Sequence, residues 1–113
     1  MTSAVIANLQ KLVGTPRDGA LLRFSLGNEY LKAGDAANAH LQLAQAVAMD
    51  PTYSAAWKLL GKALAADGQP QAALTAFRQG IAVAERKGDK QAEREMTVFA
   101  TRLQKQLETG QAP

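Results

Sequence analysis

The residues that could carry out chemistry are few, and they lie far apart along the chain. His40 is the only histidine, and neither a cysteine nor an acidic residue accompanies it at a spacing typical of metal ligands. No cysteine occurs at all, which excludes disulfides and thiolate catalysis. Ser25 and Ser54 have no candidate base beside them. The sequence therefore predicts no catalytic residue, no metal site and no cofactor.

The aspartates have a structural explanation. Four of them stand at expected helix boundaries, where a carboxylate can cap a helix end: Asp18, Asp35, Asp50 and Asp89. The stretches "GDAANA" and "GDKQAE" separate expected helices, follow no strand, and lack the glycine spacing of a phosphate-binding loop. Because capping accounts for these carboxylates without general acid–base catalysis, we predict that the protein is not an enzyme.

The charge balance favours neither nucleic acid nor a membrane as the partner. The net charge is +3, with 13 basic residues dispersed among 10 acidic ones. No apolar run approaches the ~18 residues that a membrane span needs, and "MTSAVIANLQKLVG" lacks the basic start of a signal peptide. These features predict a cytoplasmic protein. Nucleic-acid binding is a less favoured alternative, which a steep loss of binding with rising salt would reveal.

The elements that must position these residues are helices. A length of 113 residues suits one domain, and abundant alanine with few β-branched residues favours helix throughout. Glycines and prolines at expected boundaries predict helices over 20–33, 36–50, 54–67 and 70–87. Periodic apolar residues add an N-terminal helix over 3–13 and a C-terminal helix over 89–108, followed by a frayed tail over 109–113.

The middle of the chain contains an internal repeat with an offset of 34 residues. At that offset Leu26-Gly27 falls on Leu60-Gly61, and Gly34 falls on Gly68. Small residues at Gly27, Ala39 and Ala46 predict a close approach of the two helices within a unit. A generic alanine-rich bundle is the alternative, but it would not place glycines and alanines at a matching offset.

The two units resemble tetratricopeptide repeats, whose helix–turn–helix carries a characteristic residue pattern. Unit 20–53 has Arg23 in place of the aromatic residue and otherwise matches at Leu26, Gly27, Tyr30, Ala39, Leu43, Ala46 and Pro51. Unit 54–87 has Glu85 where a proline is expected and matches at Trp57, Leu60, Gly61, Leu64, Ala73, Phe77 and Gly80. The resemblance implies an all-α, right-handed stack of two helix–turn–helix repeats between an N-terminal helix and a C-terminal capping helix.

The C-terminal helix is expected to close the stack. The strict 34-residue frame would bury Lys90 and Arg94, whereas a shift by one residue buries Ala92, Met96 and Phe99 instead. Met96 then occupies the site that glycine holds in the two repeats, and this bulky residue indicates that no further helix follows closely. We therefore predict a monomer; self-association through an open end is the alternative. Arg23, in place of an aromatic residue, predicts a looser N-terminal junction.

The resemblance implies a protein–protein interaction module that holds a peptide or helix of a partner protein in a concave groove. The runner-up is a self-associating or accessory subunit of a larger assembly. Residues out of phase with the core would line the groove: Leu21, Phe24, Asn28, Leu31 and Lys32 in the first unit, and Ala55, Lys58, Lys62, Ala65 and Ala66 in the second. Two other interpretations stay open. The N-terminal helix could cover the apolar stripe, and the lysines could form a solvated face.

A carboxylate clamp is a further implication of the resemblance. Some tetratricopeptide domains hold the C-terminal carboxylate of a peptide with lysine, asparagine and arginine side chains on successive first helices. Asn28 matches that pattern directly, and Lys90 and Arg94 match it in the shifted frame. Phe24 and Leu59 occupy the remaining positions and do not match. Acidic residues at positions 89, 93 and 95 can neutralise the same basic groups.

Overall fold

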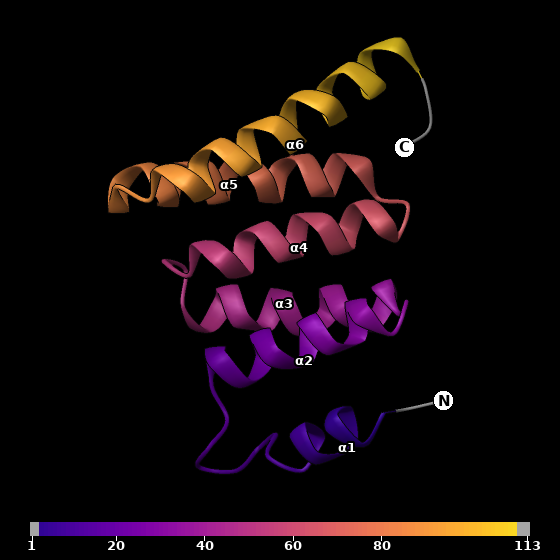
Figure 1. Cartoon of the computed structure of the whole chain (residues 1–113), viewed down its shortest axis with the longest axis vertical. Helices are drawn as coiled ribbons and strands as arrows, with labels where there is room; N and C mark the ends of the chain where they lie inside the picture. Colours follow the sequence, from indigo (N-terminus) through magenta and orange to yellow (C-terminus); the bar gives the residue numbers. More distant parts are fainter. Residues whose placement is uncertain (1–2, 111–113) are drawn as a thin grey trace.

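Six helices lie within residues 3–110, the part of the chain that this structure, a computed structural model, describes. They are α1 (Ala4–Gln10), α2 (Ala20–Lys32), α3 (Ala36–Met49), α4 (Ser54–Ala66), α5 (Pro70–Lys87) and α6 (Lys90–Thr109). Figure 1 shows them stacked one above another in chain order, with α1 at one end and α6 at the other. Residues 3–110 contain no strand, and the expected all-α helical stack is confirmed.

Local side-chain chemistry sets the boundaries of the central helices. The carboxylates of Asp35 and Asp89 accept hydrogen bonds from backbone N–H groups three residues further on, at 3.1 and 3.2 Å, and so cap α3 and α6. Pro70 begins α5, where its missing N–H is not needed. Gly34 and Gly68 have φ angles of 78° and 72°, a left-handed conformation that glycine adopts without a steric cost.

The first helix is shorter than the expected range of 3–13. α1 ends at Gln10, and the chain continues as a tight turn in which Leu12 N–H and Val13 N–H bond to carbonyls three residues back, at 3.0 and 3.2 Å. The Leu12 carbonyl then accepts from both the backbone N–H and the hydroxyl of Thr15. Leu12 and Val13 nevertheless pack against the cluster that joins α1 to α2.

Each central hairpin closes over a glycine. A Cβ atom added at Gly27 would collide with the side chain of Leu43, and one added at Gly61 would lie 2.5 Å from Cε1 of Phe77. Leu43 is fully buried and Phe77 is only 1% exposed, so a Cβ atom at either glycine would force a buried side chain to repack. The close approach expected at these two positions is therefore present in both hairpins.

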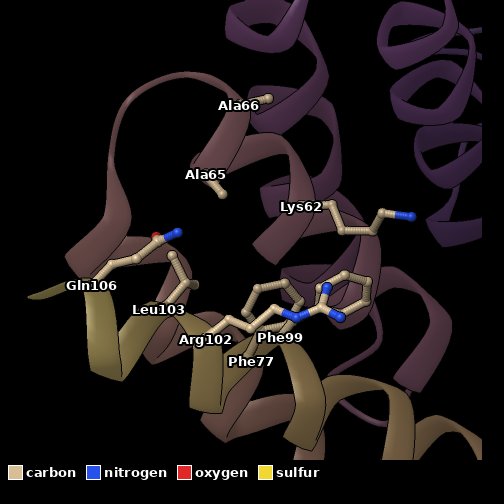
Figure 2. Close-up of a pocket in the computed structure, with 8 residues that line it drawn as sticks. All are labelled: Lys62, Ala65, Ala66, Phe77, Phe99, Arg102, Leu103 and Gln106. Atoms are coloured by element: carbon tan, nitrogen blue, oxygen red, sulfur yellow. The ribbon is translucent and has the colours of Figure 1, made fainter. Parts of the chain in front are cut away.

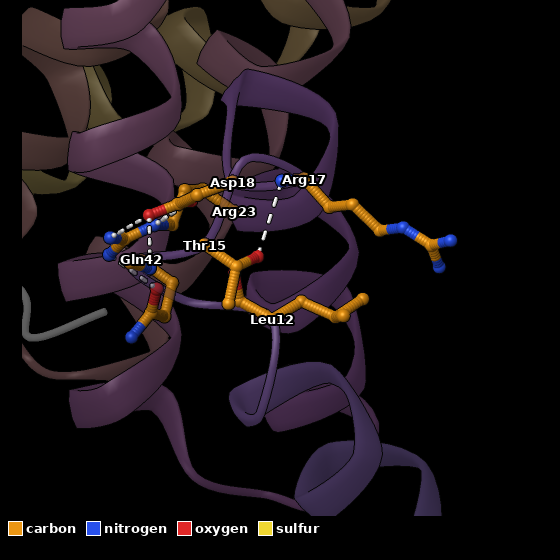
Figure 3. A network of polar contacts seen from close by, with 7 residues as sticks. Leu12, Thr15, Arg17, Asp18, Arg23 and Gln42 are labelled. Carbon is orange, nitrogen blue, oxygen red and sulfur yellow. Dashed lines mark hydrogen bonds and ion pairs between the residues drawn. The ribbon is translucent and has the colours of Figure 1, made fainter.

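The junction at the N-terminal end of the stack is joined by a polar network rather than by an aromatic residue. Arg23 donates from Nε and Nη2 to the two carboxylate oxygens of Asp18, both at 2.9 Å, and from Nη1 to Gln42 of α3 at 3.2 Å. Asp18 also accepts from the Gly14 N–H at 2.9 Å. Figure 3 shows Arg23 between Asp18 and Gln42, beside the turn that contains Thr15.

This network adds directional contacts at Arg23 that the sequence did not indicate. Hydrogen bonds from Arg23 and from the Gly14 N–H hold the pKa of the Asp18 carboxyl far below its usual range, which keeps the group charged. The two side chains are each only 15% exposed. A bidentate pair between an arginine and a carboxylate also restricts their relative orientation. The turn before α2 is thus held to both α2 and α3 by directional contacts.

The last helix packs in the shifted frame. Ala92 and Met96 are buried, whereas Lys90 and Arg94 are exposed, as the one-residue shift requires. Met96 is completely buried, and its sulfur fills the space beside Gly80 that a side chain at that position would need. Figure 1 shows the C-terminal half of α6 diverging from α5. Side chains of α6 line a hollow toward α4 and another toward α5.

Candidate functional site

One side of the stack is built from the first helix of each hairpin and from the last helix. α4 lies in the middle of this surface and contacts both α2 and α6. We call it the α2–α4–α6 face. The residues that the sequence predicted for the groove or the carboxylate clamp all belong to these helices, at positions that are exposed or half-buried. Leu21 is the most exposed large apolar residue in the described part of the chain, at 69%.

The half of this face between α2 and α4 is largely filled. Phe24 does not project freely, because its ring stacks on that of Tyr53 with 4.9 Å between the centroids. Leu31 packs against the main core, and Asn28 beside it is half-buried. Lys32 is exposed and forms an ion pair with a glutamate one turn earlier at 3.2 Å. Burial, and the nearby Asp50 carboxylate to a lesser extent, raise the pKa of Tyr53 above its usual range.

The N-terminal helix does not cover the apolar stripe of α2. α1 packs through Ile6 and Leu9 against Leu22 and Leu26, which lie on the core side of α2. Leu21 therefore stays open to solvent, and Phe24 is covered by Tyr53 rather than by α1. Of the two interpretations of the apolar stripe, the structure supports partial exposure, limited to the start of α2.

Between α4 and α6 the face opens into an apolar pocket of about 380 Å³. Its lining residues come from three helices: Lys62, Ala65 and Ala66 of α4, Phe77 of α5, and Phe99, Arg102, Leu103 and Gln106 of α6. Figure 2 shows the two alanines facing Leu103 and Gln106 across the pocket, with the phenyl rings beside them. We call this cavity the α4–α6 pocket.

The pocket has an aromatic wall and a basic rim. The rings of Phe77 and Phe99 stack with centroids 5.4 Å apart. The ammonium nitrogen of Lys62 lies 5.5 Å from the centroid of the Phe99 ring, within the range of a cation–π contact. Lys62 and Arg102 are exposed, and no carboxylate among residues 3–110 lies within ion-pair distance of either.

The remaining basic residues expected in the groove are placed differently. Lys58 lies further along the same α4–α6 boundary, but its ammonium group forms an ion pair with Glu95 of α6 at 3.1 Å. Lys90 and Arg94 line a separate hollow of about 290 Å³ together with Glu93, all three from α6. The guanidinium of Arg94 donates to the Lys90 carbonyl at 3.3 Å. Of the four basic residues, only Lys62 borders the α4–α6 pocket, whereas Lys58 lines a second hollow and Lys90 and Arg94 line a third.

Arg102 and Gln106 complete the pocket and were missed by the sequence argument. With Phe99 and Leu103 they recur at spacings of three and four residues, which places them on one side of α6. That spacing is visible in the sequence, where it indicated only that Phe99 is buried. What the sequence did not show is that α6 diverges from α5, so that this side of α6 faces a cavity rather than a neighbouring helix.

His40 has a structural role in the described part of the chain. Its Nε2 lies 3.0 Å from the Asp67 carboxylate, and Gln69 donates to the same aspartate at 2.9 Å, so these contacts join α3 to the turn after α4. Residues 3–110 contain no group of three or more potential metal ligands. No helix within the same range is long and apolar enough to cross a membrane.

Comparisons with a family model, a protein sequence and a solved structure each find a clear similarity. Residues 30–92 match the family model described as tetratricopeptide repeat. The chain is 52% identical over 99 residues to the TPR repeat-containing protein PA0015 of Pseudomonas aeruginosa, covering 88% of this chain and 94% of that protein. Its structure is similar to the solution structure of protein BPP2914 from Bordetella parapertussis, with a TM-score of 0.79, 37% identity and 96% of each chain covered.

Proposed function

This chain belongs to the tetratricopeptide repeat family, and on that premise we propose that it is a protein–protein interaction module without catalytic activity. It binds an extended segment or a helix of a partner protein across the α2–α4–α6 face. The observation that carries this proposal is the α4–α6 pocket, in which two phenyl rings lie beside two basic side chains that lack an acidic partner in the described structure.

The features of this face suit peptide binding. Apolar surface supplies affinity when it is removed from water, about 25 cal/mol per Å². The exposed Leu21 and the α4–α6 pocket offer such surface at the two ends of the face. Charged side chains at the rim set orientation and on-rate more than total affinity. A segment that lies across α4 could contact both apolar sites at once.

The test is to select ligands without assuming their sequence and then to map where they bind. Random linear peptides displayed on phage are panned on the full chain, and the selected peptides are titrated against ¹⁵N-labelled protein. We expect the backbone amide shifts of α2, α4 and α6 to change, and we expect Lys62→Glu to weaken binding. Lys105→Glu, on the side of α6 that faces away from the pocket, is the matched control. Peptides that shift only the outer sides of α3 and α5 would contradict the proposal.

Self-association is the second candidate, and the open side of α6 favours it. A hollow of about 510 Å³ lies between α5 and α6 on the far side of the stack, where Leu74, Ile81 and Ala100 contribute apolar surface. A second copy of the chain could pack there as a further helix would in a longer stack. Sedimentation velocity over a wide concentration range separates the two candidates. A constant mass of 12.0 kDa would exclude self-association.

A further inference from the structure

We infer that the α4–α6 pocket binds one large apolar side chain of the partner segment and that an acidic side chain next to it binds Lys62 and Arg102. The inference rests on the proposed function and names the chemistry that this site selects. The acidic group is thus assigned to Lys62 and Arg102 at the pocket rim, and not to Lys90 and Arg94, which the clamp hypothesis named and which line a separate hollow.

The size of the pocket fits a single side chain. Ligand pockets typically range from about 300 to 1,000 Å³, and this one, at about 380 Å³, is near the lower limit. Its wall is aromatic, and a phenylalanine or leucine side chain would gain offset contacts with the rings of Phe77 and Phe99. A cavity of this kind holds one anchoring residue, while the rest of the segment lies along α4.

The pocket exists because two positions of α4 carry small residues. Ala65 and Ala66 are the equivalents, 34 residues on, of Leu31 and Lys32 in α2. Leu31 packs against the core at the corresponding place between α2 and α4. Where α2 fills its junction with side chains, α4 leaves the space empty. The small residues therefore distinguish a binding junction from a purely structural one.

The charges at the rim identify the neighbouring group. Two other lysines of the face have acidic partners: Lys58 pairs with Glu95 at 3.1 Å, and Lys32 pairs with a glutamate at 3.2 Å. Lys90 and Arg94 line a separate hollow and do not border the pocket. Lys62 and Arg102 have no acidic partner among the described residues, although both border the same apolar cavity. A carboxylate at the rim would receive charge-assisted hydrogen bonds, and a guanidinium can bind it through two parallel bonds. An acidic side chain next to the apolar anchor satisfies both requirements.

Three blocked peptides test this chemistry directly. The first is Ac-Ser-Gly-Glu-Phe-Glu-Gly-Ser-NH2, the second replaces both glutamates by glutamine, and the third replaces phenylalanine by alanine. Titrations followed by amide chemical shifts should show the first peptide perturbing the pocket residues in wild type. We expect each altered peptide to raise the dissociation constant about three- to tenfold or more, since exposed charge pairs and a single buried ring contribute on that scale.

Variants of the protein separate the two parts of the inference. Ala65→Leu places in the pocket the residue that α2 has at the equivalent position and should abolish binding of the first peptide. Arg102→Gln should reduce the preference for glutamate over glutamine, since only Lys62 would remain at the rim, whereas Lys105→Gln, which lies away from the pocket, should leave it unchanged. Thermal unfolding of each variant verifies that it remains folded.

The outcomes distinguish this inference from the proposed function. Equal binding of the glutamate and glutamine peptides, unchanged binding by Ala65→Leu, or no binding of the first peptide at millimolar concentration would each overturn the inference. If panned peptides then shift other parts of the α2–α4–α6 face, the interaction function stands without this specificity. If they shift only the outer sides of α3 and α5, both proposals fail.

Discussion

Replacing Gly61 by alanine tests the packing on which the stack and the pocket depend. A Cβ atom at this position would lie 2.5, 2.6 and 2.7 Å from three ring atoms of Phe77. Carbon atoms in favourable contact are about 3.5–4.0 Å apart, so the ring would have to move by roughly 1 Å. Phe77 is only 1% exposed and stacks on Phe99, so moving its ring would disturb this stacking and the wall of the α4–α6 pocket.

Two opposing effects determine the size of the change. Overpacking of a well-packed core costs about 1–3 kcal/mol, while alanine stabilises a helix interior by about 1 kcal/mol relative to glycine. Because the collision involves a fully buried ring rather than the end of a flexible chain, we expect the steric effect to dominate. The free energy of unfolding should fall by about 1–2 kcal/mol, and Tm by roughly 5–10 °C.

The measurement is urea unfolding followed by far-UV circular dichroism, with Gly19→Ala as the matched control. A Cβ atom at Gly19 meets nothing within 4 Å, and its φ of 173° is an extended conformation that any residue adopts. The control should change the free energy of unfolding by no more than about 0.5 kcal/mol. If Gly61→Ala is as stable as wild type, or more stable, then α4 and α5 do not approach as closely as the structure indicates.

Three further predictions concern single contacts. Because the pKa of Asp18 is lowered in the folded protein, its charged form stabilises the fold above pH ~4. This stabilisation is lost as the pH falls below ~3.9, the pKa of an unfolded aspartate. The difference in unfolding free energy between wild type and Asp18→Asn should therefore shrink from pH 6 to pH 2.5 in urea titrations. Met96→Ala truncates a completely buried side chain and should cost about 2–5 kcal/mol, whereas Val98→Ala, at 49% exposure, should change stability by less than about 0.5 kcal/mol in the same assay. Tyr30→Phe removes the 2.8 Å hydrogen bond that the Tyr30 hydroxyl accepts from the Gln10 side chain. Amide hydrogen exchange should then accelerate in α1 and stay unchanged in α4, α5 and α6. Uniform acceleration across all helices would contradict this local role.

The fold could be predicted from the sequence because its main constraint is local and repeats. Glycine at 27 and 61 marks the places where Leu43 and Phe77 press against the preceding helix, and no larger residue fits there. The same reasoning placed α6, since only the shifted frame buries Met96. These positions depend on nearest-neighbour packing between consecutive helices, which a residue pattern records directly.

The site could be predicted only in part, because it depends on geometry that the pattern does not record. Lys62 was expected in the groove and lines the pocket, but Arg102 was not considered. Arg102 reaches the pocket because α6 diverges from α5, and no single residue in the sequence indicates that divergence. The partner of Phe24 was missed for a related reason: Tyr53 precedes α4 in a short connection, and only the path of that connection brings its ring to 4.9 Å.

The two junctions of the α2–α4–α6 face show how one backbone arrangement can serve two purposes. Each hairpin has an equivalent seam, the contact between its two helices, where a glycine lies against a large buried side chain. The positions out of phase with the seam differ: Leu31 fills space and contacts the core in α2, whereas Ala65 leaves space in α4. Because these positions do not contribute to the seam, they can vary in size and charge without changing the stack. In the binding mode that we propose, specificity is therefore set at positions that the repeat pattern does not constrain. For this reason the pattern predicts the fold but not the ligand.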